Sequence, residues 1–164
     1  MIGVEYAKSL YEVHPDNKTC LDEFSLFMTF YDELSPIIKS PGIKKEEKHK
    51  IIEKSFKGFS EMFKYFIFVV IDNDRFYALK DIFNEYKKLY NKENNIASCD
   101  CYSNTKLTDK EKKEIIKFLE KELGKTIVLN EFVDSSYNGI KIVSDNKTID
   151  YTLESRINNM RLSI

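Results

Sequence analysis

Hydrophobic residues in the first ninety positions recur mainly at the three-to-four-residue spacing of amphipathic helices. This spacing predicts helices over residues 4–13, 19–34, 44–59 and 75–90, with a short helical turn that begins at Ser35-Pro36. Polar and charged residues fill most positions between the apolar stripes, so each stripe is expected to pack into a shared core. The pattern therefore predicts an all-α bundle of five or six helices.

One stretch departs from the amphipathic pattern. The run from Tyr65 to Ile71 is apolar without a break. It is far shorter than the roughly 20 apolar residues that cross a bilayer. Because helical patterns flank it, we expect a buried helix, although its residue types also suit a strand. A helix that is apolar all round must be covered all round, so one face requires either more of this chain or a partner.

Residues 91–95 are polar and mark the expected domain boundary. We place the N-terminal domain at residues 1–92 and the C-terminal domain at residues 96–164. The sequence of the second domain predicts secondary-structure elements in the order β-α-β-β-α. Its strands are expected over residues 96–102, 126–129 and 140–143, with a strand end at 148–150, a helix from Leu107 to Gly124 and a closing helix over 152–162. Thr108 and Glu111 have the spacing of a capping box, and Asn138-Gly139 is a turn signal. The predicted fold class is mainly α with a small α/β domain.

Composition agrees with a soluble globular chain. The sequence has 164 residues, of which 42% are hydrophobic and 32% charged, and its net charge is −1. This charge balance supplies no strong field for nucleic acid or an anionic membrane. The start lacks the basic and apolar regions of a signal peptide. Three cysteines are an odd number and suggest a reducing compartment, so we expect a cytosolic setting.

The sequence contains no pattern that predicts catalysis. No glycine-rich phosphate loop is present. Cys99 and Cys101 have a spacing that invites a metal site, but a closed zinc site needs about four ligands. The remaining ligand types, Cys20, His14 and His49, are not at ligand spacing. We therefore expect Cys99 and Cys101 to pack in a strand, and we expect no catalytic residue, metal or cofactor.

Two charged features have alternative interpretations. Asp134 and Asp150 suggest a carboxylate pair, but each follows a predicted strand and suits a turn or cap. The lysines of residues 44–59 suggest a nucleic-acid patch, yet glutamates interleave with them, which favours a solvated helix face. An adaptor that binds RNA or acidic proteins through this helix stays open as an alternative function.

Short motifs in both halves follow the order of a known family. They are Tyr6-Ala7-Lys8-Ser9-Leu10-Tyr11, Ser40-Pro41-Gly42-Ile43, Asp72-Asn73-Asp74-Arg75, Cys101-Tyr102-Ser103, and the run Val133-Asp134-Ser135-Ser136-Tyr137-Asn138-Gly139-Ile140, followed by Ile149-Asp150 and Arg156-Ile157. Together they resemble the delta subunit of the F-type ATP synthase, the relative of the mitochondrial oligomycin-sensitivity-conferring protein. The chain departs from the family at Asn138 and Tyr151, where glycine is usual. Asn tolerates a positive φ, so no change of fold is expected at Asn138.

The resemblance implies a non-catalytic stator subunit. In this family a six-helix N-terminal bundle binds the N-terminal helix of an alpha subunit, in a groove between its first and fifth helices. Those helices correspond here to residues 4–13 and 63–71. The alpha-subunit groove is then expected to involve Tyr6, Leu10, Phe66, Val69 and Val70. The C-terminal domain is expected to bind peripheral-stalk subunit b.

The same resemblance implies a setting for the chain. It would be a monomer within a hetero-oligomer that resists rotor torque during ATP synthesis coupled to ion transport. It would lie at the cytoplasmic face of the cell membrane and meet the membrane only through the complex. The resemblance implies no cofactor and no nucleic-acid partner.

Overall fold

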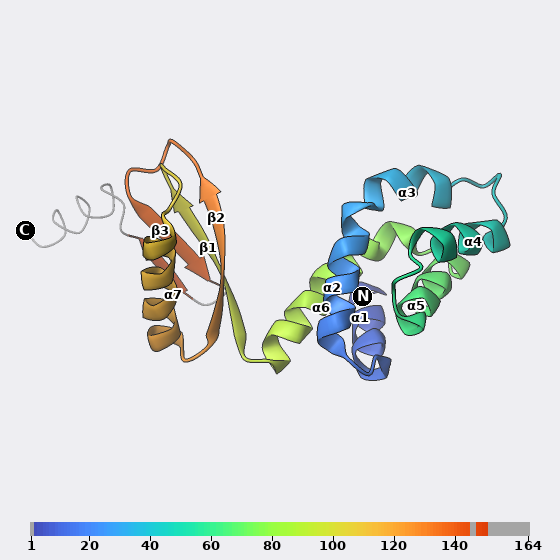
Figure 1. The fold of residues 1–164 in the computed structure, drawn as a ribbon, viewed down its shortest axis with the longest axis horizontal. Helices are drawn as coiled ribbons and strands as arrows, with labels where there is room; N and C mark the ends of the chain where they lie inside the picture. Colours follow the sequence, from blue (N-terminus) through green and yellow to red (C-terminus); the bar gives the residue numbers. More distant parts are fainter. Residues whose placement is uncertain (1, 145–146, 151–164) are drawn as a thin grey trace, which may run out of the picture. The chain divides into compact units, whose positions relative to one another are not determined.

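The computed structural model describes residues 2–144 and 147–150, and the chain divides into two compact units, Met1–Tyr90 and Asn91–Ile164. Across the described residues the protein is mostly helical, with one small mixed sheet (Figure 1). The closing helix predicted over residues 152–162 lies outside the described residues. Within the described part, none of the helices combines the length and the hydrophobicity needed to cross a membrane.

Helices make up the first unit. They are α1 (Ile2–Val13), α2 (Asn17–Thr29), α3 (Tyr31–Ile38), α4 (Lys45–Ser55), α5 (Glu61–Asp72), a 3₁₀ turn η1 (Phe76–Ala78) and α6 (Leu79–Glu93). Aromatic rings dominate their shared core, where Phe24 contacts Phe63, Phe83 and Tyr86 at centroid distances of 5.3, 5.0 and 6.1 Å. The apolar run that the sequence singles out is helical, as predicted, and forms most of α5.

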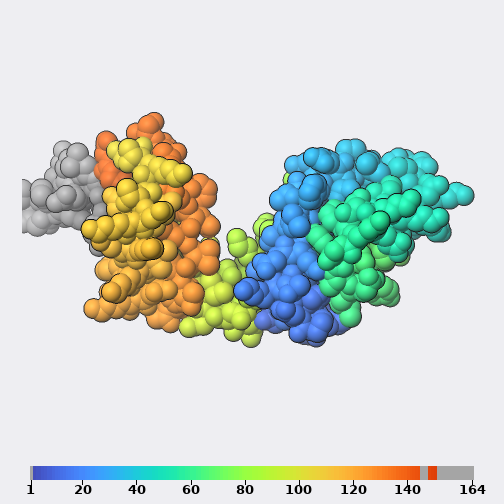
Figure 2. Space-filling view, in the orientation of Figure 1, coloured from blue at the N-terminus to red at the C-terminus, as the bar shows by residue number. Residues whose placement is uncertain are grey.

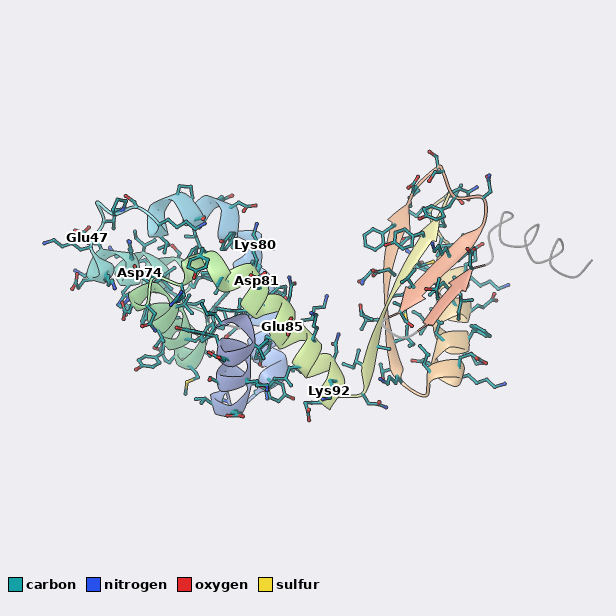
Figure 3. The ribbon with its side chains drawn as sticks, turned by 180° about the vertical axis from the view of Figure 1, so that it is seen from behind. Glu47, Asp74, Lys80, Asp81, Glu85 and Lys92 are labelled. Carbon is teal, nitrogen blue, oxygen red and sulfur yellow. The ribbon has the colours of Figure 1, made fainter. Side chains whose placement is uncertain are left out.

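Helix α6 is amphipathic. Leu79, Ile82 and Tyr86 are buried on one side. Figure 3 shows the charged side chains of Lys80, Asp81, Glu85 and Lys92 along the same helix. The alternation matches the predicted stripe, so this helix is held by its apolar face.

The prediction of one helix over residues 19–34 was wrong, because the helix breaks at Phe30. The Phe30 backbone leaves the helical region, with φ −98° and ψ 1°, and its N–H bonds to the carbonyl of Phe27. The new helix direction buries Tyr31, whose ring stacks on Phe76 at 5.3 Å. Ser35 and Pro36 therefore lie inside α3 and do not start a separate turn. Core packing of the aromatic rings outweighs the local cap signal.

Two other helix limits differ from the prediction. Helix α4 ends at Ser55, because Phe56 leaves the helix with φ −122° and places its ring 4.8 Å from that of Phe27. Before α6, Asp74 has a positive φ of 54°, so the chain enters the helix through η1 and not directly at Arg75. At its other end α6 continues to Glu93.

The second unit is a mixed sheet with one helix. Its elements are β1 (Ile96–Ser103), α7 (Asp109–Leu123), β2 (Thr126–Val133), β3 (Ile140–Ser144) and β4 (Lys147–Asp150), and the strand order is β2-β1-β3-β4. Strand β1 pairs in parallel with β2, through the α7 crossover, and antiparallel with β3. The predicted capping box of Thr108 and Glu111 starts α7, and Gly124 ends it with φ 63°.

Alternate residues of β1 point to opposite faces of this sheet. Cys99 and Cys101 are fully buried against Leu119 of α7 and Ile142 of β3, so the cysteines pack in the strand as expected. Burial also raises the pKa of the Cys101 thiol, which disfavours the thiolate. The opposite face of β1 carries Ser98, Asp100 and Tyr102.

The connection between the two units is short. Helix α6 ends at Glu93 and β1 begins at Ile96. Asn95, with φ 55°, donates through its amide to the carbonyl of Gly124 at 3.2 Å. Its own carbonyl accepts the N–H of Thr126 at 3.1 Å. The second of the two connecting residues is thus already fixed to the sheet domain.

Candidate functional site

A groove of about 420 Å³ lies between α1 and α5. Figure 2 shows α1 (blue) and α5 (green) side by side at the surface of the first unit. The lining residues are Glu5, Tyr6, Ser9, Leu10 and Val13 from α1, and Met62, Tyr65, Phe66 and Val69 from α5. On each helix they recur at three-to-four-residue spacing, so each helix contributes one continuous and mainly apolar face.

Helix α5 has one closed face and one open face. Phe63, Ile67 and Val70 are fully buried in the core of the unit. On the groove side, Tyr65 is 65% exposed and Met62 is 36% exposed. The apolar helix predicted to need cover on every side is therefore only partly covered by the described residues. Large exposed apolar side chains beside a groove are typical of a protein-binding surface.

Four of the five predicted groove residues meet at this place. Tyr6, Leu10, Phe66 and Val69 line the groove, whereas Val70 is absent from its lining and lies in the core. Leu10 and Phe66 are themselves largely buried, so they form the floor and not the rim.

The rim comes mainly from residues that the sequence analysis did not select. Val13 is 59% exposed at the end of α1, and Met62 and Tyr65 face it from α5. The spacing of Met62, Tyr65 and Val69 is the signal that identifies this face. It becomes readable only once the core side of α5 is known.

One end of the groove is fixed by contacts of Tyr6. Its ring meets that of Phe66 edge-on, with a centroid distance of 6.4 Å. Its hydroxyl accepts a hydrogen bond from the side-chain amide of Asn73 at 3.1 Å. The start of α1 thus lies against the end of α5, and the two helices run antiparallel.

The opposite end is fixed by a polar network around Ser60. The Ser60 hydroxyl caps α5 by accepting the Phe63 N–H at 3.3 Å, and it donates to Glu23 at 2.7 Å. Glu23 also accepts the backbone N–H of Ser60 at 2.6 Å. His14 is buried, and its Nε2 lies 3.1 Å from the same hydroxyl. Its Nδ1 accepts the Asp16 N–H at 3.2 Å. This network joins α1, α2 and α5.

The network is built to hold position and not to activate a nucleophile. Because Nδ1 of His14 accepts a hydrogen bond, the proton of the neutral ring is on Nε2. Nε2 therefore donates to Ser60, and in this tautomer it has no lone pair with which to take the serine proton. The Ser60 hydroxyl is left with two donors and one acceptor around it, which satisfies it fully.

The second unit carries its own exposed apolar surface on the sheet side opposite α7. We call it the aromatic face, and it consists of Tyr102, Val128, Phe132 and Tyr137. The rings of Tyr102 and Phe132 stack at 5.2 Å, and Tyr137 lies 5.5 Å from Tyr102. Phe132 is 45% exposed. Stacked, half-exposed rings of this kind are enriched at protein interfaces.

No group of metal-ligating side chains occurs among residues 2–144 and 147–150. Asp134 has the turn role expected for it, because it accepts the Ser136 N–H at 2.9 Å, and this hydrogen bond lowers the pKa of its carboxyl group. Among the described residues, the groove and the aromatic face are two exposed, mainly apolar surfaces.

Comparison with known proteins gives a consistent answer over the whole chain. The family model described as ATP synthase delta (OSCP) subunit matches residues 2–164. The chain is 29% identical to the ATP synthase subunit delta of Bacillus thuringiensis (strain Al Hakam), over 96% of this chain and 92% of the relative. The same figures hold for the ATP synthase subunit delta of Bacillus anthracis.

A solved structure shares the fold. A chain in the cryo-EM structure of the Toxoplasma gondii mitochondrial ATP synthase hexamer aligns with a TM-score of 0.76. The alignment covers 99% of this chain and 97% of that chain, at 12% sequence identity. The fold is thus shared at low sequence identity.

Proposed function

The chain belongs to the ATP synthase delta (OSCP) family, and we propose that its α1–α5 groove receives the N-terminal helix of an ATP synthase alpha subunit. As a delta subunit it is a stator component of the ATP synthase, part of the peripheral stalk, with a structural and not a catalytic role. The family match favours this function over the adaptor that binds RNA or acidic proteins. The observation that carries the proposal is the open apolar face of α5 beside α1.

The groove has the features of helix-in-groove recognition. Such sites take an amphipathic helix whose apolar residues recur at i, i+3, i+4 and i+7. The rim residues Val13 and Tyr65 keep more than half of their surface exposed, and Met62 keeps about a third. Covering each of them contributes on the order of 1 kcal/mol to binding. Three such anchors around the floor formed by Leu10 and Phe66 are expected to contribute much of the specificity for a docked helix.

We assign a different binding partner to each of the two domains. Residues 1–92, with α1 to α6 as a six-helix bundle, attach the chain to the catalytic head. Residues 96–164 attach it to peripheral-stalk subunit b, and the aromatic face is the surface we assign to that contact. The chain is then a monomer within the complex. It lies at the cytoplasmic face of the cell membrane, which it meets only through other subunits, and it resists rotor torque during ATP synthesis coupled to ion transport.

Calorimetric titration of the full chain with a synthetic peptide tests the head contact. The peptide is the first ~20 residues of the alpha subunit from the same organism. We expect one-to-one binding with a negative heat-capacity change, which marks apolar burial. Tyr65→Ala should weaken it about tenfold, which corresponds to about 1.4 kcal/mol.

The matched control is Tyr77→Ala, because Tyr77 is 56% exposed but lies outside the groove. Equal affinity for the Tyr65→Ala variant and the parent would exclude the groove as the binding site. Absence of any binding by the folded chain would exclude the alpha-subunit helix as the partner.

A second titration, with the C-terminal segment of subunit b, tests the stalk contact. Phe132→Asp should abolish binding, because it places a charge in the centre of the aromatic face. Phe118→Asp is the control, since Phe118 is 42% exposed on α7, on the other side of the sheet. If the control variant loses binding and Phe132→Asp keeps it, the stalk contact lies on the α7 side.

A further inference from the structure

We infer that the helix received by the α1–α5 groove carries basic residues on both flanks of its apolar face. The inference rests on the proposed function and adds the charge pattern of the partner. It follows from the acidic side chains that border the groove on both helices.

On α1, the acidic border consists of Glu5 and Glu12. Glu5 lines the groove and Glu12 directly precedes the rim residue Val13. Both side chains are exposed, and at helical spacing they lie on one edge of α1 with Ser9 between them. The nearest basic residue of this helix, Lys8, lies further round the helix, on the side away from the groove.

On α5, the border consists of Glu61 and Asp72, which share the helix edge of Tyr65. The Glu61 side chain is 91% exposed and forms an ion pair with Lys64, which is largely buried. Asp72 lies 2.9 Å from Nε2 of His49. Each carboxylate therefore has one partner within the domain and keeps an exposed side towards solvent.

Both ends of the groove carry carboxylates. The antiparallel packing places Glu12 and Glu61 at the same end, where His14 meets Ser60. Glu5 and Asp72 belong to the other end, because they directly precede Tyr6 and Asn73, which are hydrogen-bonded to each other. Lysine or arginine side chains on the flanks of an incoming helix are complementary to these carboxylates.

Exposed ion pairs of this kind have a modest effect on affinity and a clear dependence on salt. Replacing both Glu12 and Glu61 by glutamine is expected to weaken binding about fivefold at low salt. At about 0.5 M salt, where charges a few ångströms apart are already screened, the double variant and the parent should bind alike.

Two synthetic peptides test the inference with the full chain. They share one amphipathic apolar face, and one has lysine and the other glutamate at the flanking positions. The lysine-flanked peptide should bind more tightly, and only its binding should fall in the E12Q/E61Q variant. An E33Q/E46Q variant is the control, because Glu33 and Glu46 are exposed glutamates on α3 and α4.

Equal binding of the two peptides, or an unchanged affinity of the E12Q/E61Q variant at low salt, would overturn the inference and leave the proposed function intact. If the lysine-flanked peptide binds and the alpha-subunit peptide does not, the charge pattern stands and the proposed partner fails. Binding of neither peptide would reject the groove as a helix site.

Discussion

Replacing Ser60 by alanine should strongly destabilise the helical unit. Ser60 is the N-cap of α5, and its hydroxyl also links Glu23 of α2 to His14 of α1. The substitution removes all three hydrogen bonds while leaving the apolar core unchanged. It therefore isolates the contribution of the polar network that holds one end of the groove.

The expected cost follows from these contacts. Loss of an N-cap hydroxyl costs about 1 kcal/mol. A hydrogen bond to a charged carboxylate contributes about 2 kcal/mol, and buried His14 Nε2–H loses the partner it has at 3.1 Å. Glu23 keeps the backbone N–H of Ser60 and is only half-buried, so water offsets part of the loss. We expect a decrease of about 3 kcal/mol in the free energy of unfolding, and a melting temperature lower by about 15 °C.

Hydrogen exchange of the α5 amides in the full chain measures this opening free energy directly. Thermal melting followed by circular dichroism gives a second value. Ser25→Ala is the matched control, because Ser25 is exposed within α2 and its hydroxyl only bonds back to the Leu21 carbonyl. That variant should change stability by less than about 0.5 kcal/mol. A loss below about 1 kcal/mol for Ser60→Ala would refute the reasoning, since the cap alone accounts for that much.

Three further predictions concern other sites. The hydrogen bonds that Glu131 accepts from Lys112 and from the Leu107 N–H lower the pKa of its carboxyl group below the ordinary 4.5. The stability that the carboxylate contributes is therefore present above pH 4.5 and is lost as the pH falls through the lowered pKa. In unfolding measurements across pH 2–5, the E131Q variant should lose less stability on acidification than the parent chain. Gly124→Ala should lower the free energy of unfolding in urea by about 1 kcal/mol, because a φ of +63° is unfavourable for a residue with a Cβ atom. Gly58→Ala should leave the free energy of unfolding unchanged, because no atom lies within 4 Å of the new Cβ. Burial raises the pKa of Cys20 to about 11, so a thiol reagent at pH 8 should modify it only at the rate of unfolding, and rapid labelling of the native chain would contradict this.

Local signals predicted those elements whose ends are set by neighbouring residues. The capping box of Thr108 and Glu111 and the left-handed Gly124 are decided within one turn of helix, and both were readable from the sequence. The helix break at Phe30 was not readable, because it depends on the packing of Tyr31 against Phe76, a residue 45 positions away in the chain. Tertiary packing of aromatic rings decided that boundary against the cap signal of Ser35.

Which side chains line the α1–α5 groove was only partly predictable from the sequence. An uninterrupted apolar run such as Tyr65–Ile71 presents similar residues at every angle, so periodicity cannot tell which side faces the core. This is why Val70, which is buried, was chosen and Met62 was not. The network of His14, Ser60 and Glu23 joins residues 37 and 46 positions apart, and no local pattern marks it.

The short connection after α6 determines how the chain carries mechanical load. Two residues, Asn94 and Asn95, separate the last residue of the helix from the first residue of the sheet, and when fully extended they span at most about 7 Å. Asn95 is already anchored to the sheet domain by its bonds to Gly124 and Thr126. A pull on one domain therefore reaches the other through backbone bonds, with almost no slack to take up first. The joint therefore has no loop whose straightening would absorb the load.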